Sequence, residues 1–484
     1  MYIGIDLGTS GIKVILMTGD GEIAATASSE LTVSRPRPLW SEQDPEAWWR
    51  ALQDCMQQLA GAGDLSGVAA IGLSGQMHGA TFLDSAGSVI RPAILWNDGR
   101  CAEQCRQIEQ EITEARAITG NIVMPGFTAP KVLWLMQNEP ANFTRIDKIL
   151  LPKDYLRFRM CGDFATDMSD AAGTAWLDVA KRDWAPEMLR ACGLNKNHMP
   201  ALFEGSEITG YLSDDVAQQW GMKSVPVVAG AGDNAAGAIG VGVIHSGQAM
   251  LSLGTSGVYF AVSERFTSNP DSAVHSFCHA LPDTWHLMSV VLSAASCLQW
   301  FADAIAKAPL DTLLAELENS EINTEQCPVF IPYLSGERTP HNDPNARGMF
   351  FGLTHETHRT HLLYAVLEGV SFALKEGAQA LHQATQKPGS ITLIGGGSKS
   401  GYWRQMLSDV LNLTLECRSG GEVGPALGAA RLALLGHKPG TDIRQICPVP
   451  PLVATHQPDA ARSQLFAERF IRYQQIYHRV KDLF

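Results

Sequence analysis

The chain has 484 residues, of which 45% are hydrophobic and 18% are charged. This balance is typical of folded globular proteins and excludes wholesale disorder. The 37 basic residues are outnumbered by 50 acidic ones, so the net charge is −13. We therefore expect no nucleic-acid or membrane partner, because no overall cationic field is available to bind either. At about 150 residues per domain, the length allows two large domains or three smaller ones.

The amino terminus reads MYIGID, with neither a basic segment nor an apolar run that ends in a cleavage site. We therefore expect no secretory signal. The ten cysteines lack the paired spacing of a zinc site and the density of a disulfide scaffold, which predicts reduced thiols in a cytoplasmic protein. The small-residue stretch 225–244 has Asp233 and Asn234 at its centre, where a charge would be costly in lipid, so no membrane span is expected there.

The predicted elements alternate between strands and helices along the chain. β-prone apolar runs separated by longer periodic stretches are typical of an α/β fold. In the first half we expect strands at 2–5, 12–16, 69–73, 148–151 and 225–229, and helices at 45–59 and 100–117. In the second half we expect strands at 249–253, 258–262, 329–332 and 391–394, and a long helix at 360–385.

One short motif occurs twice, about half the chain apart. Residues 5–12 read IDLGTSGI, and residues 251–258 read LSLGTSGV. Because each copy lies between two β-prone runs, each is predicted to be two strands joined by a tight turn. The simplest interpretation is two related domains, 1–245 and 246–484, that open with the same hairpin.

The repeated turns have the chemistry that a phosphate chain requires. Glycine lets backbone N–H groups approach an anion closely, and the two hydroxyls add donors. A single copy would more often be only a hairpin, but duplication at matched positions favours phosphate binding. The residues expected to bind the phosphates of a nucleotide are Gly8, Thr9, Ser10, Gly254, Thr255 and Ser256.

The two copies differ at an informative position, where Asp6 of the first corresponds to Ser252 of the second. A carboxylate beside a phosphate would repel it unless a magnesium ion, which usually keeps several waters, lay between them. We therefore assign Asp6 to a magnesium ion that it holds through water. Lys13, on the returning strand, is either a positive charge near the phosphates or a residue that faces solvent.

A third glycine-rich turn, GGGS at 395–398, follows the strand expected at 391–394 and precedes a helical stretch at 402–411. A strand, a glycine-rich turn and a helix start form a nucleotide-binding arrangement. The turn matches neither the Walker A nor the G-x-G-x-x-G pattern. We expect Gly396, Gly397 and Ser398 to lie against the base or ribose of the nucleotide.

Residues 230–234 read GAGDN and precede a stretch of small residues. Because the flanking chain is almost free of charge, Asp233 is not expected to be an idle surface group. Spacing alone leaves two alternatives, since Asp233 either caps the following helix or takes a proton from an alcohol. Phosphoryl transfer to a hydroxyl needs such a carboxylate, and Asp233 is the best candidate.

Together these residues resemble the FGGY family of carbohydrate kinases over essentially the whole chain. The matching segments are DLGTS at 6–10, GFTAPKVLWL at 126–135, GDN at 232–234, LGTSG at 253–257 and the stretch 348–368. Two further segments are similar to those of the family members that act on D-xylulose: SGQMHG at 74–79 and PYLSGERTP at 332–340.

The resemblance implies two actin-like ATPase (RNase H-like) domains with an active-site cleft between them. The first would bind the sugar and the second mainly ATP. It also implies that Met77 and His78 contact the sugar with Asn234, and that Asp233 is the base, with Asp6 as the second catalytic carboxylate. The implied reaction converts D-xylulose and ATP, with Mg²⁺, to D-xylulose 5-phosphate and ADP. Four other residues are candidates without assigned roles: Gln76, Asn97, Asp98 and Arg100.

Two alternatives to this reaction stay open. The chain is compatible with a family member that acts on L-ribulose, L-fuculose or glycerol, because fold-level similarity does not decide the substrate. An actin- or chaperone-like ATP-driven binding protein would share the duplicated turns but release phosphate to water. The oligomeric state is also open, with a homodimer as one alternative.

Overall fold

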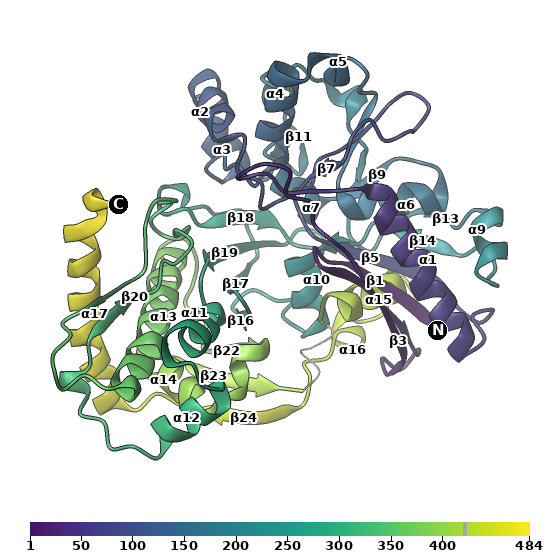
Figure 1. The fold of residues 1–484 in the computed structure, drawn as a ribbon. Helices are drawn as coiled ribbons and strands as arrows, with labels where there is room; N and C mark the ends of the chain where they lie inside the picture. Colours follow the sequence, from purple (N-terminus) through teal and green to yellow (C-terminus); the bar gives the residue numbers. More distant parts are fainter. Residues whose placement is uncertain (420–423) are drawn as a thin grey trace.

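The computed structural model describes residues 1–419 and 424–484, with the side chain of Ser398 left out. Two seven-stranded sheets, each covered by helices, form two lobes (Figure 1). We call the elements around the sheet that contains the amino-terminal strand the first lobe, and those around the other sheet the second lobe. The α/β class predicted from the sequence is confirmed.

The first sheet has the strand order β13-β14-β5-β1-β2-β3, and β15 pairs beside β5. Its strands are β13 (Ile208–Tyr211), β14 (Pro226–Val228), β5 (Ala70–Gly75), β1 (Tyr2–Leu7), β2 (Gly11–Met17), β3 (Ile23–Glu30) and β15 (Ala231–Gly232). The second sheet has the order β18-β19-β17-β16-β22-β23-β24. Its strands are β18 (His275–Cys278), β19 (Trp285–Val291), β17 (Gly257–Ser263), β16 (Ala249–Leu253), β22 (Ser390–Ile394), β23 (Thr414–Arg418) and β24 (Leu452–His456).

Short two-stranded pairs accompany the large sheets. They are β4 (Glu42–Gln43) with β7 (Ala93–Ile94), β6 (Thr81–Leu83) with β8 (Lys148–Leu150), β9 (Ala165–Asp167) with β12 (Ala201–Phe203), β10 (Leu177–Asp178) with β11 (Asp183–Trp184), and β20 (Val329–Ile331) with β21 (Met349–Phe351).

Helices α1 to α10 belong to the first half of the chain. They are α1 (Pro45–Ala62), α2 (Ala102–Glu111), α3 (Ala115–Thr119), α4 (Thr128–Asn138), α5 (Pro140–Phe143), α6 (Pro152–Cys161), α7 (Met168–Ala171), α8 (Pro186–Arg190), α9 (Asp214–Gln219) and α10 (Asp233–Gly240). The second half contains α11 (Ala295–Trp300), α12 (Leu310–Glu318), α13 (Arg359–His382), α14 (Gly401–Leu411), α15 (Gly424–His437), α16 (Ile443–Ile446) and α17 (Ala460–Val480).

The repeated motif of the sequence occupies the equivalent place in both sheets. β1 pairs antiparallel with β2, and β16 pairs antiparallel with β17. Each first strand has a parallel neighbour on its other side, β5 in the first sheet and β22 in the second. The sequence repeat is therefore a structural repeat, and both hairpins predicted from it are present.

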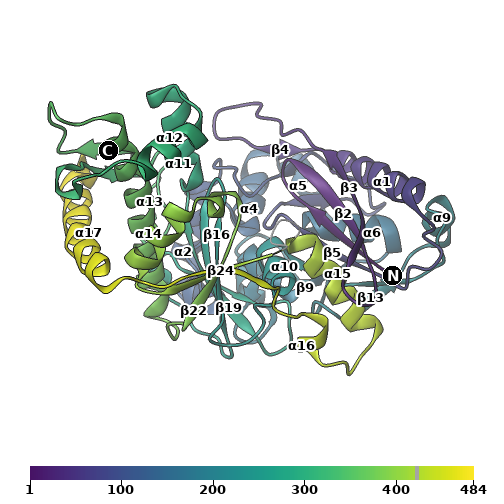
Figure 2. The same ribbon diagram turned by 90° about the horizontal axis from the view of Figure 1, so that it is seen from below.

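Helix α15 comes from the second half of the chain but packs on the first sheet, beside β1 and β5 (Figures 1 and 2). The approach is close enough to require glycine in the strands. A Cβ on Gly4 would lie 2.0 Å from the carbonyl oxygen of Ala426, and one on Gly72 would lie 2.0 Å from that of Ala429. The two halves of the chain are therefore in close contact where α15 packs on the first sheet. The domain boundary between 245 and 246 stays a prediction.

One predicted helix was wrong in extent. The stretch 100–117 was expected to be continuous, but it divides into α2 and α3 because Ile112 has extended backbone angles of φ −113° and ψ 90°. The carboxylate of Glu109 stabilises the turn back, since it accepts from the guanidinium of Arg116 and from the backbone N–H of Val123. These tertiary hydrogen bonds override the helical periodicity of the segment.

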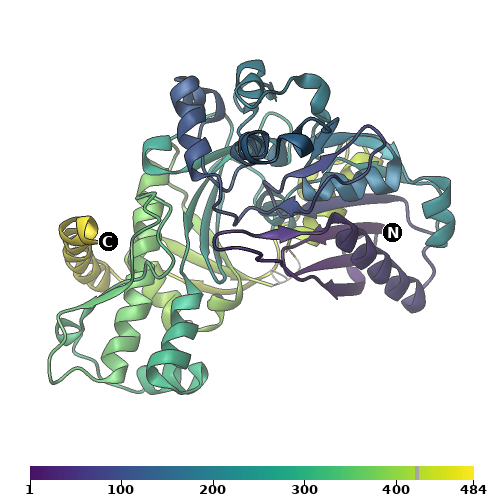
Figure 3. The ribbon, with the colours of Figure 1, turned by 45° about the horizontal axis from the view of Figure 1, so that its top comes forward.

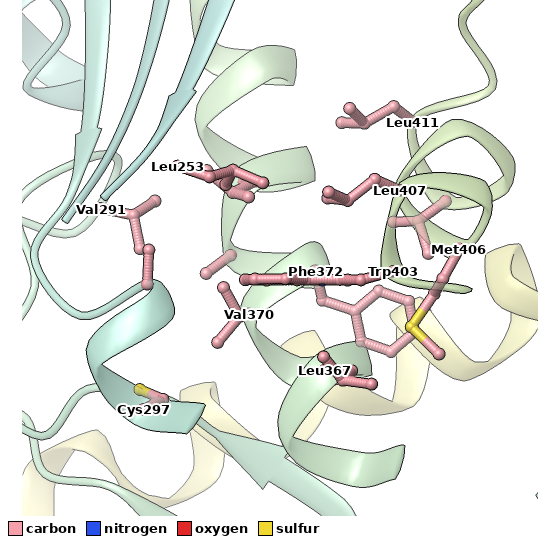
Figure 4. Close-up of a cluster of buried hydrophobic side chains, with 14 of the residues drawn as sticks. Leu253, Val291, Cys297, Leu367, Val370, Phe372, Trp403, Met406, Leu407 and Leu411 are labelled. Carbon is pink, nitrogen blue, oxygen red and sulfur yellow. The ribbon is translucent and has the colours of Figure 1, made fainter. Parts of the chain in front are cut away.

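The core of the second lobe lies between its sheet and helices α13 and α14 (Figure 4). Leu253, at the end of β16, and Trp403, in α14, belong to this buried cluster. A Cβ on Gly397 would lie 3.0 Å from the Cβ of Leu253 and 2.9 Å from the ring of Trp403. The turns that follow β16 and β22 are therefore both packed against this core.

The long helix α17 covers the outer side of the second lobe, on the side away from the first lobe (Figures 1 and 3). Within residues 1–419 and 424–484, no helix has both the length and the apolar character that crossing a membrane requires.

Replacing Gly72 by alanine should destabilise the protein, because the added methyl group would meet the backbone of α15. We expect a loss of roughly 1–3 kcal/mol in the free energy of unfolding, which is typical of overpacking, and a lower Tm in scanning calorimetry. Gly61→Ala in α1 is the matched control, since its Cβ would meet nothing within 4 Å and alanine favours a helix. Equal Tm values for the two variants would contradict the close packing of α15.

Candidate active site

Three neighbouring parallel strands of the first lobe end at one edge of the sheet. Asp6 of β1 lies opposite Ser74 of β5, which in turn lies opposite Ala231 of β15. Asp233 follows β15 directly, as the first residue of α10. The carboxyl ends of parallel strands are the common location of ligand sites in α/β proteins. The structure therefore brings together Asp6 and Asp233, which the sequence analysis proposed on separate grounds.

The carboxylate of Asp233 is held by its neighbour Asn234. Its Oδ1 accepts from the backbone N–H of Asn234 at 2.7 Å and from the side-chain Nδ2 at 2.8 Å. The capping position of α10 is occupied by Gly232, so the alternative that Asp233 caps this helix was wrong. Asn234, which was expected to contact the sugar, orients the carboxylate of Asp233. Oδ2 of Asp233 is left for another partner.

Both carboxyls have raised pKa values. Burial, followed by the charge of Asp6, raises the pKa of Asp233 to about 7, although the hydrogen bonds from Asn234 oppose the shift. Burial also raises the pKa of Asp6 to about 6, against a hydrogen bond from the Ser74 hydroxyl and the charge of Lys13. Lys13 lies opposite Asp6 in the β1–β2 register. A carboxyl with a pKa near 7 is well matched to taking a proton at neutral pH.

The excess of negative charge at this edge suits a divalent cation. Among the residues that the structure describes, no group of three or more His, Cys, Asp or Glu side chains is arranged to hold a metal ion. A cation with one protein carboxylate, several waters and substrate oxygens is the usual arrangement for Mg²⁺. Asp6 therefore fits the water-mediated role expected of it.

Met77 and His78 extend the site away from β5. Met77 is buried against the turn before Asp233, since a Cβ on Gly232 would lie 2.9 Å from its Cγ and Sδ. His78 has a left-handed backbone with φ 68°, and its Nδ1 lies 2.6 Å from the carbonyl oxygen of Gly173. Because a carbonyl oxygen only accepts, Nδ1 must carry the proton in this hydrogen bond.

The His78 ring is a hydrogen-bond acceptor at its other nitrogen. Burial and the charge of Lys131 lower the pKa of His78 to about 3, with a further contribution from Arg338. The ring is therefore neutral at pH 7, and with Nδ1 protonated its Nε2 carries a lone pair. A sugar hydroxyl can donate to this nitrogen.

Lys131 is a functional residue that sequence reasoning missed. Its side chain is fully buried, and its Nζ donates to the carbonyl oxygens of His78 at 2.8 Å and Gly126 at 2.7 Å. Burial lowers its pKa to about 7. In the sequence, the segment 126–135 stands out only through the family resemblance. The structure shows that it fastens His78 in its unusual backbone conformation.

Aromatic rings from both lobes surround His78. The ring centroid of Phe127 lies 5.0 Å from that of His78, and the centroid of Phe277, in β18, lies 6.2 Å away. Arg338, from the segment 332–340, acts electrostatically on His78 and donates to His275 from Nη1 at 3.3 Å. Residues of the second lobe therefore take part in the site, and only the resemblance of 332–340 pointed to them in the sequence.

The first hairpin turn is stabilised from within the protein. The hydroxyl of Thr9 donates to Gln76 at 2.9 Å and accepts from the indole of Trp96 at 2.9 Å, while the N–H of Gly8 donates to the carbonyl oxygen of Gly11 at 2.9 Å. Ser10 is exposed at the tip. Through these hydrogen bonds, Thr9, Gly8 and Gln76 stabilise the conformation of the turn. Direct contact between this turn and a phosphate stays a prediction.

The charged residues of the segment 96–100 have a structural function. Arg100 pairs with Asp98 at 2.6 Å and with Glu42 at 2.8 Å, and Asp98 also accepts from the backbone N–H of Ser41. Asn97 is exposed. Because Asp98 and Arg100 satisfy each other, we do not assign them to a ligand.

The glycine-containing turns of the second lobe lie side by side. Ser252 of β16 lies opposite Ile394 of β22, so the turns 254–256 and 395–397 leave the same sheet edge. The carbonyl oxygen of Thr255 accepts from the N–H of Ala294 at 2.9 Å, just before α11. The N–H of Gly254 donates to the carbonyl oxygen of Ser256 at 3.0 Å. These bonds hold the turn in place.

In the turn after β22, one glycine is closely packed and the next has free space beside it. Gly395 has φ 93° and lies so close to Leu253 that a Cβ would be 2.6 Å from its carbonyl oxygen. A Cβ on Gly396 would meet nothing within 4 Å, so this position is not covered by the rest of the described chain. Gly397 lies against the core, and the side chain of Ser398 falls outside the described structure.

Comparison with known proteins agrees with this arrangement. Residues 1–240 match the amino-terminal domain, and residues 249–437 the carboxy-terminal domain, of the FGGY family of carbohydrate kinases. The chain is 58% identical to a xylulose kinase of Escherichia coli (strain K12) over 484 residues, the full length of both chains.

Solved structures give the same result. A crystal structure of a "xyloylose kinase" from Brucella ovis is 46% identical with a TM-score of 0.96 and covers 100% of both chains. A ligand-bound xylulose kinase from Lactobacillus acidophilus is 26% identical with a TM-score of 0.93, over 99% of this chain and 98% of that one. The expected actin-like architecture of two domains is thereby confirmed, and the chain belongs to the FGGY family of carbohydrate kinases.

Proposed function

We propose that this protein transfers the γ-phosphoryl group of ATP to D-xylulose, giving D-xylulose 5-phosphate and ADP. The observation that carries the proposal is the carboxyl of Asp233, whose pKa is raised to about 7 between Asp6 on one side and the Met77–His78 segment on the other. The names of the most similar relatives support the choice of sugar.

The proton transfer follows from the geometry of Asp233. Its Oδ1 is held by Asn234, so Oδ2 is the oxygen that takes the proton of the terminal sugar hydroxyl. The oxygen so released forms the new bond to the γ-phosphorus while the bond to the ADP oxygen breaks. Met77 supplies an apolar wall, and Nε2 of His78 accepts from another hydroxyl. These contacts hold the reacting oxygen in line and keep water out.

The nucleotide is proposed to lie across the turns of the second lobe. The turn 254–256 would receive the phosphates, and Gly396 with Gly397 the base or ribose. A magnesium ion, when bound, would be held by Asp6 through water and would neutralise the charge of the phosphates. This division assigns the sugar to the proposed domain 1–245 and ATP mainly to 246–484.

Replacing Asp233 by asparagine should abolish the base while keeping the shape of the side chain. We expect turnover to fall by about 10²-fold or more, the usual contribution of a general base, with ATP binding retained in calorimetry. Asp214→Asn, in the first turn of α9 on the surface of the same lobe, is the matched control and should leave turnover unchanged. Near-normal turnover of the Asp233 variant would refute the assignment.

The dependence of kcat/KM on pH tests the coupling between the two carboxyls. Because protonated Asp233 cannot accept a proton, kcat/KM for the sugar should fall as pH drops below about 7. Asp6→Asn removes a neighbouring negative charge, so the pKa of Asp233 should decrease and the acid limb should move to lower pH. An acid limb that stays in place, measured at saturating magnesium, would show that Asp6 does not act on the base.

A substrate panel separates this proposal from its alternatives. ADP formation should be fastest with D-xylulose and slower with L-ribulose, L-fuculose and glycerol. ATP hydrolysis that is independent of any sugar would instead favour an ATP-driven binding protein.

A further inference from the structure

The loop that carries Arg338 is fastened to the edge of the second sheet on both sides of this residue. The carboxylate of Glu337 accepts the backbone N–H groups of Leu292 at 3.0 Å and Arg338 at 2.7 Å. The hydroxyl of Thr339 donates to the carbonyl oxygen of Ala273 at 2.9 Å and accepts from the N–H of Val290 at 3.1 Å. The backbone of Arg338 is therefore positioned by buried neighbours.

The guanidinium of Arg338 has few partners for its donors. An arginine carries five N–H donors, and within the described residues Arg338 makes a single side-chain hydrogen bond, from Nη1 to His275. It forms no ion pair there, whereas Arg469, which is buried, is bound by both carboxylate oxygens of Glu368. Burial lowers the pKa of Arg338 and raises that of Glu337, the carboxyl that acts on it electrostatically, to about 8, so Glu337 provides little counter-charge.

His275 holds the guanidinium in a defined place. Because arginine only donates, Nε2 of His275 must be the acceptor, and its Nδ1–H then donates to Oδ1 of Asn121 at 3.2 Å. Asn121 is itself buried and donates to the carbonyl oxygen of Ser276 at 2.9 Å. Nη2 of Arg338 lies near Gly126, since a Cβ on this glycine would be 4.0 Å from it.

The charges around the proposed sugar site are negative at one end and positive at the other. The charge that acts on Asp233 is that of Asp6, and the charges that act on the His78 ring are those of Lys131 and Arg338. If the 5-hydroxyl of the sugar lies at Asp233, then C1 and C2 lie toward His78 and Arg338. In the ring form of this ketopentose the 5-oxygen closes the ring, so the reacting form is the open chain, with a free ketone at C2.

We propose that Arg338 binds the ketone end of the open-chain sugar, donating to the C2 carbonyl oxygen, and thereby favours ketoses over polyols. This inference rests on the proposed function. A carbonyl oxygen is a planar acceptor without a proton, which suits the forked donors of a guanidinium. The alcohol of a polyol at C2 is tetrahedral; its oxygen can also accept from a guanidinium, but its O–H then needs an acceptor elsewhere, because arginine only donates.

The test compares Arg338→Met and Arg338→Lys with the wild type. The readouts are KM for D-xylulose, the inhibition constant of xylitol, in which an alcohol replaces the ketone, and KM for MgATP. For Arg338→Met we expect KM for D-xylulose to rise about 10- to 100-fold, the scale of a charge-assisted hydrogen bond. The inhibition constant of xylitol should change much less, and KM for MgATP should stay the same. Arg338→Lys, which keeps the charge but loses the fork, should lie between.

Arg359→Met is the matched control, since this arginine is on the surface and pairs with Glu316 of α12. Unchanged KM for D-xylulose, equal losses for D-xylulose and xylitol, or a loss confined to MgATP would each overturn the inference. If Arg338→Met does not fold by circular dichroism, Arg338→Lys decides by the same criteria. A wild type without sugar-dependent ADP formation would refute the proposed function itself, whereas an active wild type with an unaffected Arg338→Met would refute only the role of Arg338.

Discussion

Two carboxylates that repel each other, Asp6 on β1 and Asp233 directly after β15, lie at one edge of the first sheet on either side of β5, and the proposed chemistry depends on this placement. Desolvation and the charge of Asp6 raise the pKa of Asp233 to about 7. Burying like charges costs stability. The packing of the surrounding strands and of α10 must offset that cost, which is the usual compromise of a site built for function.

The groups around these carboxylates are fixed mainly by hydrogen bonds that do not touch a ligand. Asn234 orients Asp233, Lys131 holds the backbone of His78, and the hydroxyl of Thr9 stabilises the first turn. Such support keeps the reacting groups in one geometry before the substrate arrives. It also explains why several residues of matching motifs are buried and satisfied internally.

The two halves of the chain are joined by packing in two places. α15 lies against glycines of β1 and β5, while Met77, Phe127 and Phe277 share one hydrophobic cluster that spans both halves of the chain. Domain closure in enzymes of two lobes excludes water from the reaction. In this protein, Arg338 of the second lobe acts electrostatically on His78 and donates to His275, which brings polar groups of that lobe to the proposed sugar site.

The sequence by itself determined the features that depend on local patterns. The duplicated hairpins, the α/β class, most strands and the long helix α13 follow from hydrophobic periodicity and from glycine-rich turns, which act over a few residues. Asp6 was found because Ser252 replaces it in the second copy of the repeat, and Asp233 because a charge stands there in an otherwise apolar context.

The tertiary structure alone decided which distant segments meet. The division of 100–117 into two helices, the clamp of Lys131 on His78, the internal role of Thr9 and the approach of Arg338 depend on contacts between residues far apart in the chain. No pattern within one segment encodes them, because each arises only when separately formed elements pack together.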